Sequence, residues 1–321
     1  LNDDKVLRGS KYARTLEFPL IVRRKDTYAQ QTFLDKTKFI RVFERRIRGE
    51  RRFCIQAVKE GTPPPKKRQY GEGKPAVGID LSPSTLVAYS PETAAIEELV
   101  PDCEDIEAAL RRINRAIDRS YRATNSEAYN ENGTFKKGCR LVPSKRCQKL
   151  QAKRKELFRK QAAVRKQSHE KAANELIAQS TDIKVEDTAV TSWTARAKET
   201  TVNRKNGKIH SKKRFGKTVA RRAPAMLLSI IDRKLKYRGY ALKRVISRQV
   251  KASQYDHSTG QYRKKRLCDR WCVIDGHRVQ RDLYSAFRIS YVTGKNLDTI
   301  DRKACCDDWV NFLKLQDEVL K

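Results

Sequence analysis

Three acidic residues, Asp80, Glu186 and Asp282, stand where a metal-dependent site could form. Asp80 lies in the apolar segment 76–81, Glu186 ends another short apolar segment, and Asp282 opens an amphipathic one. Hydrolysis of phosphodiester bonds by a two-metal mechanism needs carboxylates around two cations roughly 3.5–4 Å apart. Mg²⁺ prefers such hard oxygen ligands. We therefore predict that these three acids are catalytic and bind two Mg²⁺ ions.

Each of these acids also has an ordinary interpretation. Asp80 could be a turn residue, Glu186 a surface acid, and Asp282 a residue that stabilises a helix N-terminus through the helix dipole. The presence of all three at suitable elements, in this order along the chain, favours the metal site over three unrelated acids.

The elements around the acids predict how they are brought together. Hydrophobic patterning predicts strands at 76–81, 84–90, 95–100, 182–187 and 240–246, and helices at 105–122, 144–179, 224–237, 281–292 and 300–320. This order is the RNase H arrangement, an α/β fold with a mixed central sheet. In that arrangement strand ends and the start of one helix converge, so the acids are expected to meet there.

Composition and patterning also predict four segments. Strand-like runs at 16–22, 38–43 and 52–58, followed by a proline-rich basic linker, predict a small basic β-barrel-like unit of the OB type. The segments are this β unit with its linker at 1–73, a catalytic domain at 74–250 with a helical insertion at 104–179, an irregular insertion at 251–280, and a final helix with the C-terminal tail at 281–321.

The charge balance indicates a polyanionic partner. The chain has 321 residues, with 72 Lys and Arg against 38 Asp and Glu, which gives a formal net charge of +34. Such an excess repels itself in a compact protein unless a polyanion neutralises it, and nucleic acid is the usual one. A membrane-surface protein and a merely soluble basic protein are the alternatives. We predict a nucleic-acid-binding protein.

The sequence gives little sign of a membrane or an oxidising compartment. No apolar run approaches the roughly 20 residues that span a bilayer. The N-terminal residues show no signal-peptide pattern. The eight cysteines are scattered and do not form a disulfide framework for a chain of this size. We therefore expect a cytoplasmic protein with no membrane partner.

A long basic helix is the best candidate for contact with nucleic acid. Few acidic residues interleave with its cations, so a face that binds phosphates is favoured over a merely solvated face. The candidate nucleic-acid-binding residues are Lys145, Arg146, Lys149, Lys153, Arg154, Arg159 and Lys160.

Three motifs resemble those of a known family. Together they are similar to the RuvC nuclease motifs of TnpB, the transposon-encoded RNA-guided nucleases, and of their relatives among type V CRISPR effectors. The motifs are 77–81 (VGIDL), then 169–171 (HEK) with 176–177 and 183–187 (IKVED), and finally 281–287 (RDLYSAF), within a resemblance that covers roughly residues 75–292.

The resemblance implies a ribonucleoprotein that cuts DNA. A guide RNA would pair with one strand of a double-stranded DNA target, and the RuvC site would cut the DNA. The β unit before residue 74 resembles the end of the family's wedge domain, which holds guide RNA. One or two protein copies per RNA and a prokaryotic cytoplasm, with association to the nucleoid when bound to DNA, are further implied.

The segment 251–280 departs from the family, which often carries a zinc ribbon with two Cys-x-x-Cys pairs there. Here it reads as a degenerate ribbon-like insertion that binds target nucleic acid. Four zinc ligands could still be assembled, but we favour a zinc-free loop packed around Trp271 and Tyr262. The four are His257, Cys268, Cys272 and His277.

Several other residues are open to more than one interpretation. His169 could be a catalytic base, but two-metal sites need no histidine, so we favour a structural or phosphate contact. Trp193 and Phe215 could stack on unpaired bases or belong to the core.

Two other functions compete with cleavage directed by RNA. One is an RNA-guided DNA-binding protein or repressor that does not cut efficiently. The other is a RuvC-fold nuclease that acts on branched DNA without a guide. The presence of all three acids favours the cutting enzyme.

Overall fold

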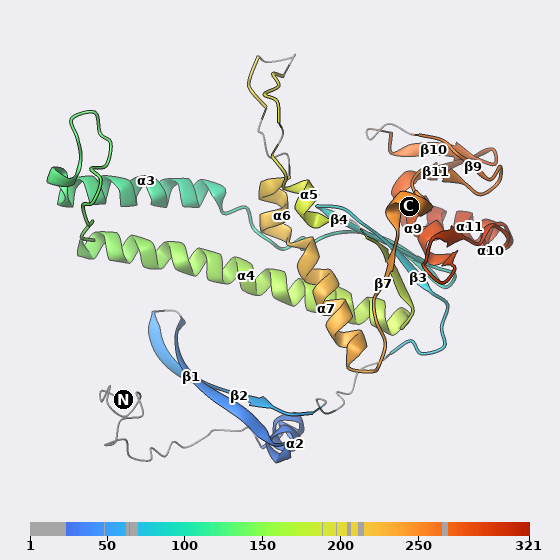
Figure 1. Cartoon of the computed structure of the whole chain (residues 1–321), viewed down its shortest axis with the longest axis horizontal. Coiled ribbons are helices and arrows are strands. Elements are labelled where there is room, and N and C mark those ends of the chain that lie inside the picture. Colours follow the sequence, from blue (N-terminus) through green and yellow to red (C-terminus); the bar gives the residue numbers. More distant parts are fainter. Residues whose placement is uncertain are drawn as a thin grey trace. The chain divides into compact units, whose positions relative to one another are not determined.

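The chain forms two compact units, residues 1–67 and 68–321 (Figure 1). The computed structural model describes residues 24–47, 49–61, 64, 70–187, 189–196, 198–203, 207–210, 215–264 and 269–321.

The first unit contains a helix and a long hairpin. Helix α2 (Thr27–Leu34) precedes the antiparallel strands β1 (Thr37–Ile47) and β2 (Glu50–Lys59). Gly49 adopts a φ of +89° in the turn between them, which suits glycine. Both predicted strands are present and longer than expected. The predicted strand at 16–22 lies outside the described residues. The two described strands, β1 and β2, form a hairpin and not the predicted barrel-like unit.

A mixed five-stranded sheet is the centre of the second unit. Its strand order is β5-β4-β3-β6-β7. The first three strands along the chain form an antiparallel meander, and the last two run parallel to β3. All five predicted strands of this unit are present. They are β3 (Val77–Leu81), β4 (Thr85–Ser90), β5 (Thr93–Glu98), β6 (Ile183–Glu186) and β7 (Lys243–Val245).

Helices cover both faces of this sheet (Figure 1). On one face, α4 (Lys145–Gln179) and α7 (Pro224–Lys236) pack on the apolar side chains of the strands. On the other, α9 (Arg281–Ser290) and α11 (Trp309–Leu320) form a second, aromatic core. The alternation of a strand's side chains between the two faces explains this arrangement. In β4, for example, alternate residues enter the two cores.

The helical insertion is an arm of two packed helices. Helix α3 (Glu107–Thr124) packs against α4, and η1 (Ser126–Ala128) follows it. The predicted helix or helix pair at 144–179 is one continuous helix. The hydroxyl of Ser144 accepts a hydrogen bond from the backbone N–H of Cys147 at 3.1 Å, a standard N-cap.

The remaining elements are short. The stretch 194–222, predicted as a loop, contains helix α6 (Gly216–Arg222), and the predicted helix at 300–320 is broken at Asp308. The described residues of the insertion 251–280 include two small hairpins. The other short elements are α5 (Val190–Trp193), α8 (Ser247–Val250), β8 (Tyr255–Asp256), β9 (Gln261–Tyr262), β10 (Trp271–Ile274), β11 (His277–Gln280), β12 (Val292–Thr293), β13 (Thr299–Ile300) and α10 (Arg302–Asp307).

None of the helices in the described ranges is both long enough and apolar enough to cross a membrane.

Candidate metal and catalytic site

Two of the predicted acids are neighbours in the sheet. The apolar residues of β3 and β6 enter the core under α4 and α7. Because side chains alternate along a strand, Asp80 and Glu186 face the other side, where α9 lies. The parallel register pairs Ile79 with Val185, so the next step along the two strands places Asp80 beside Glu186.

Helix α9 approaches β3 very closely, and Gly78 makes this possible. A Cβ atom at Gly78 would lie 2.1 Å from the carbonyl oxygen of Ala286 and 2.3 Å from the backbone nitrogen of Ser290. Neither atom can move without moving the helix. Gly78 therefore lets the backbone of α9 contact the backbone of β3 directly, with no side chain between them. This close packing holds the start of α9 near Asp80.

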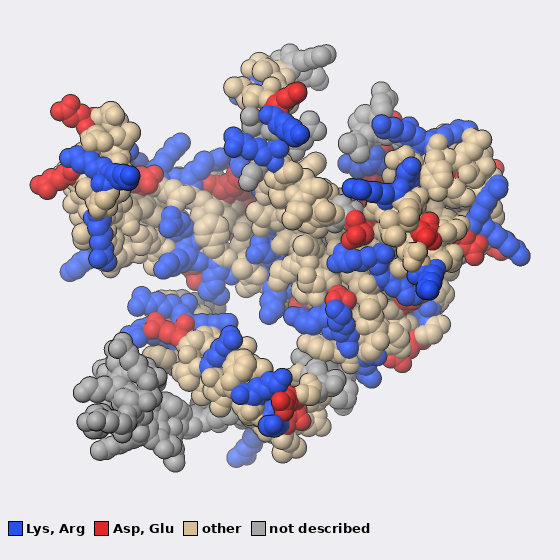
Figure 2. Space-filling view, viewed as in Figure 1, with Lys and Arg blue, Asp and Glu red and all other residues tan. Residues whose placement is uncertain are grey.

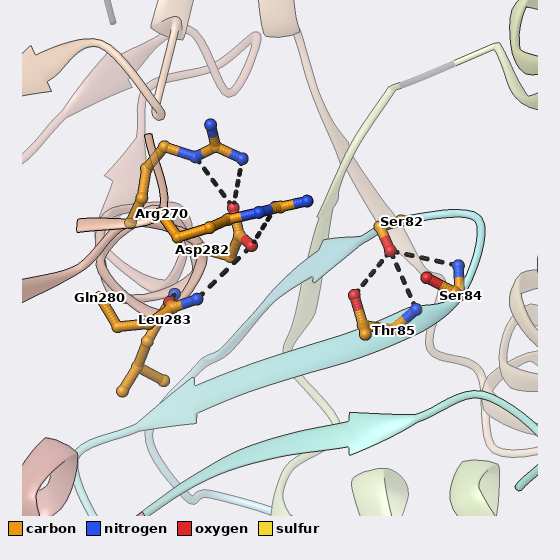
Figure 3. Close-up of polar contacts among 8 residues, drawn as sticks. Ser82, Ser84, Thr85, Arg270, Gln280, Asp282 and Leu283 are labelled. Carbon is orange, nitrogen blue, oxygen red and sulfur yellow. Dashed lines mark hydrogen bonds and ion pairs between the residues drawn. The ribbon is translucent and has the colours of Figure 1, made fainter. Parts of the chain in front are cut away.

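Asp282 occupies the first turn of α9. The side chain of Gln280 caps this helix by accepting a hydrogen bond from the backbone N–H of Leu283 at 2.5 Å. The Asp282 carboxylate forms ion pairs with Arg270 at 2.9 Å (Figure 3) and with Arg281 at 2.8 Å. Its side chain is 19% exposed, so these pairs are partly shielded from water.

All three acids line one pocket, which has a volume of about 240 Å³. Arg270 and Arg281 also line it. Its remaining wall is formed by polar residues and one valine: Ser82, Thr85, Ser253, Gln254 and Val87.

The turn that joins β3 to β4 forms part of the same pocket. The Oγ of Ser82 accepts hydrogen bonds from the backbone N–H groups of Ser84, at 3.2 Å, and Thr85, at 2.9 Å (Figure 3). This turn fixes the end of the strand that carries Asp80.

The two sheet acids are held in an environment that disfavours their charge. Burial raises the pKa of Asp80 to about 6, with a further rise from the charge of Asp282 and an opposing effect of the Ser285 hydroxyl. Burial, together with the charge of Asp80, raises the pKa of Glu186 to about 7. Two carboxylates that resist ionisation side by side form a site that a cation would stabilise.

Asp282 does not form a three-ligand metal cluster with Asp80 and Glu186 in the arrangement described. Among the described residues, no three His, Cys, Asp or Glu side chains are arranged to hold one metal ion. Asp80 and Glu186 offer adjacent hard oxygen donors, which fit Mg²⁺. Asp282 lies in the same pocket, but a cation that also bound it would have to replace its ion pairs with Arg270 and Arg281.

Arginine residues supply positive charge that the sequence did not lead us to expect in the site. Arg288 is fully buried, and its Cζ lies 3.4 Å from the centroid of the Tyr284 ring. Its charge lowers the pKa values of Asp80 and Glu186, opposing the effect of burial. Its position six residues after Asp282 on the same predicted helix was the available sequence signal.

Within the described part of the chain, the candidate zinc ligands form no group of three or more that could hold a metal ion. His257 is buried, and its Nδ1 lies 2.6 Å from the Tyr284 hydroxyl, while His277 is exposed. Cys272 is half-buried, and Cys268 lies outside the described residues.

The packing in this region differs from the prediction. Trp271 and Tyr262, expected at its centre, are 40% and 52% exposed. Tyr255, inside the segment, is buried, and so is Trp309 of α11, whose ring centroid lies 4.6 Å from that of His257. The segment therefore packs through Tyr255 and a residue distant in sequence, Trp309, and not around Trp271 and Tyr262.

The seven candidate cations of the long helix differ in availability. Arg159 forms a bidentate ion pair with Glu156, with both distances 2.7 Å, and Arg154 donates to Asn114 at 3.2 Å. The other five are exposed, and at 3.6 residues per turn they fall within roughly a third of the helix circumference. These five, which we call the α4 lysine face, are Lys145, Arg146, Lys149, Lys153 and Lys160.

Basic side chains also occur beyond the long helix, on the face of the molecule that Figure 2 shows. Figure 2 shows more Lys and Arg than Asp and Glu on the visible face, including the arm formed by α3 and α4. This distribution agrees with the net charge of +34.

Three further predicted candidates can now be placed. His169 is buried, and its Nε2 lies 2.7 Å from the carbonyl oxygen of Arg222, so its role is structural. Trp193 packs against the core under α4 and α7, whereas Phe215 is 45% exposed.

No family model and no curated protein matches the sequence. Among solved structures, the chain is similar to a chain of a CRISPR-Cas12f ternary complex determined by cryo-EM. The identity is 14%, the match covers 84% of this chain and 49% of that one, and the TM-score is 0.30. The chain thus spans about half the length of that protein, and a similarity of this size does not establish a shared fold.

Proposed function

We propose that the chain is the nuclease part of an RNA-guided DNA endonuclease, with an RNase H-type RuvC site that hydrolyses DNA phosphodiester bonds. The observation that carries this proposal is the meeting of Asp80, Glu186 and Asp282 in one pocket. They come from two adjacent parallel strands and the first turn of the helix that packs on those strands.

The order of elements supports the RNase H-like assignment. Three antiparallel strands, a helical insertion, a parallel strand, a helix, a second parallel strand and then α9 follow one another along the chain. This is the order predicted from the sequence for an RNase H arrangement. The location of Asp80 and Glu186 on β3 and β6 and of Asp282 at the start of α9 supports the same assignment.

The residues of the site have different roles in the proposed reaction. When bound at Asp80, Glu186 and Asp282, two Mg²⁺ ions would supply a hydroxide nucleophile and stabilise the leaving oxygen. Asp80 and Glu186 hold adjacent oxygen donors on a rigid sheet. Arg270, whose side chain is 61% exposed, carries positive charge at the edge of the pocket, where it can attract a phosphodiester backbone. Zinc has no role in this proposal.

The surface charge supports nucleic-acid partners. The α4 lysine face offers five exposed cations on one side of a rigid helix. A backbone contact of this kind neutralises phosphates without reading sequence, and pairing with a guide RNA would supply the sequence specificity. We therefore propose guide RNA and double-stranded DNA as the partners.

Purification of the chain from its host, followed by sequencing of co-purified RNA, tests the proposal. We expect a defined structured RNA with a variable end, and Mg²⁺-dependent cleavage of DNA that matches that end. Cleavage of branched DNA by protein that carries no RNA would instead support a guide-independent nuclease.

A binding protein that cuts poorly is the second candidate. The pairing of Asp282 with both Arg270 and Arg281 favours it, because these contacts compete with metal binding. It predicts RNA-directed DNA binding with little cleavage even at high Mg²⁺ concentration.

A further inference from the structure

Lys184 is a buried cation on the strand that carries Glu186. Its relative exposure is 7%. Its Nζ donates hydrogen bonds to the carbonyl oxygens of Ser290, at 2.7 Å, and Val292, at 2.8 Å. Ser290 is the last residue of α9, so the ammonium group caps the C-terminal end of the helix that carries Asp282.

We propose that Lys184 is a positioning residue that fixes α9 on the sheet, so that Asp282 stands over Asp80 and Glu186. The inference rests on the proposed metal site. Lys184 touches neither substrate nor metal ligands in this account, and it acts through the helix.

The register of the sheet shows how this positioning works. Gly78 and Lys184 are paired across β3 and β6, one alternation before Asp80 and Glu186. Gly78 leaves room for the backbone of α9, and the Lys184 ammonium group donates a hydrogen bond to the last carbonyl oxygen of that helix. The pair anchors the C-terminal half of the helix, while the two acids lie under its start. A helix is stiff, so an anchor at one end sets the place of the other.

The chemistry of a lysine suits this place. The last carbonyl groups of a helix have no partners within the helix and carry partial negative charge. An ammonium group has three donors and can bind two such carbonyls at once. Burying it has a large free-energy cost unless it is hydrogen-bonded, and an apolar residue would leave the two carbonyls without this donor. The two hydrogen bonds to the carbonyl groups at the end of α9 therefore explain why a lysine is buried at this position.

The test compares two matched substitutions in the full chain. Lys184→Met removes the ammonium group but keeps the length of the side chain. Lys243→Met is the control, because Lys243 lies beside Lys184 on the next strand and is 46% exposed. The Lys243 ammonium pairs with Asp182 at 2.9 Å.

The primary readout is the Mg²⁺ dissociation constant, measured by calorimetry with MgCl₂ alone. We expect Lys184→Met to weaken Mg²⁺ binding by about tenfold, as loss of a supporting contact around a metal site commonly does. Lys243→Met should stay within about twofold of the unsubstituted chain. A residue that only stabilises the fold would lower the unfolding temperature but leave the Mg²⁺ affinity of the folded protein unchanged.

The possible failures are distinguishable. If the unsubstituted chain binds no Mg²⁺, or binds it equally well after Asp80→Ala, the proposed function fails and this inference with it. If the chain binds Mg²⁺ through Asp80 but Lys184→Met binds it equally well, only the inference about Lys184 fails. Should Lys184→Met not fold, Lys184→Gln, which keeps one donor group on a shorter side chain, is measured instead. Unchanged affinity in that variant overturns the inference as well.

Discussion

Substitution of Gly78 by alanine should lower the rate of DNA cleavage while the protein still folds. The new Cβ would lie 2.1 Å from the carbonyl oxygen of Ala286, whereas carbon and oxygen atoms in close contact are roughly 3.3–3.6 Å apart. Helix α9 and β3 must therefore separate by roughly 1.2–1.5 Å. The displacement moves Asp282 away from Asp80 and Glu186.

The expected loss of activity follows from this displacement. Misplacement of catalytic groups by about 1 Å can lower a rate by about 10²-fold. Overpacking of a core costs about 1–3 kcal/mol of folding free energy, which a stable domain tolerates. We expect Gly78→Ala to fold and to cleave guide-matched DNA on the order of 10²-fold more slowly, measured as single-turnover rates at saturating Mg²⁺.

Gly71→Ala is the control. A Cβ at Gly71 would lie 2.5 Å from the carbonyl oxygen of Gln179, so the steric conflict is similar. It falls at the end of α4, before the start of β3, away from the acids. We expect Gly71→Ala to lower stability but to cleave at a rate within a few-fold of the original. Folded Gly78→Ala protein that cleaves at the original rate would refute the reasoning.

Three further predictions follow from the charges of the site and the arm. The pKa values of Asp80 and Glu186, about 6 and about 7, lie above their unfolded values of about 3.9 and 4.3, so their contribution to stability is present below about pH 4 and is lost as the pH rises through 6 to 7. Because Mg²⁺ binds the ionised forms, it should raise the unfolding temperature more at pH 8 than at pH 5.5; an equal rise at both pH values contradicts this. Arg270→Ala removes one competitor for Asp282 and should tighten Mg²⁺ binding by up to about fivefold, since an ion pair whose arginine is 61% exposed contributes about 0.2–1 kcal/mol; weaker binding, measured by calorimetry, argues against the competition. Replacing three exposed lysines by alanine should reduce the slope of log K for RNA binding against log salt by about 2–3, whereas Arg159→Ala, which removes a cation already paired with Glu156, should leave the slope nearly unchanged. The three lysines are Lys145, Lys149 and Lys160.

Local patterning was enough to find the acids and most of the elements that carry them. Asp80 and Glu186 each lie at the end of an apolar strand, and Asp282 opens an amphipathic helix; these features depend on neighbouring residues only. The mixed sheet and its helices were predicted for the same reason. Whether the fold is RNase H-like, and whether the acids bind metal, stays a prediction.

The contacts that arrange the site could not be predicted, because they join residues far apart in sequence. Lys184 bonds to carbonyl groups that lie 106 and 108 residues away. The break between α10 and α11 has the same kind of cause. The Asp308 carboxylate accepts hydrogen bonds from Tyr89 at 2.5 Å and from Tyr291 at 2.7 Å, and helical periodicity contains no sign of these partners.

Cleavage of guide-matched DNA by the Asp80→Ala ribonucleoprotein, compared with the original at equal RNA loading, tests the central claim most directly. The account predicts that Mg²⁺-dependent cleavage by the original is abolished in Asp80→Ala while RNA is retained, with the same result for Glu186→Ala and Asp282→Ala. Cleavage by the Asp80→Ala complex at the original rate would contradict the assignment of the site.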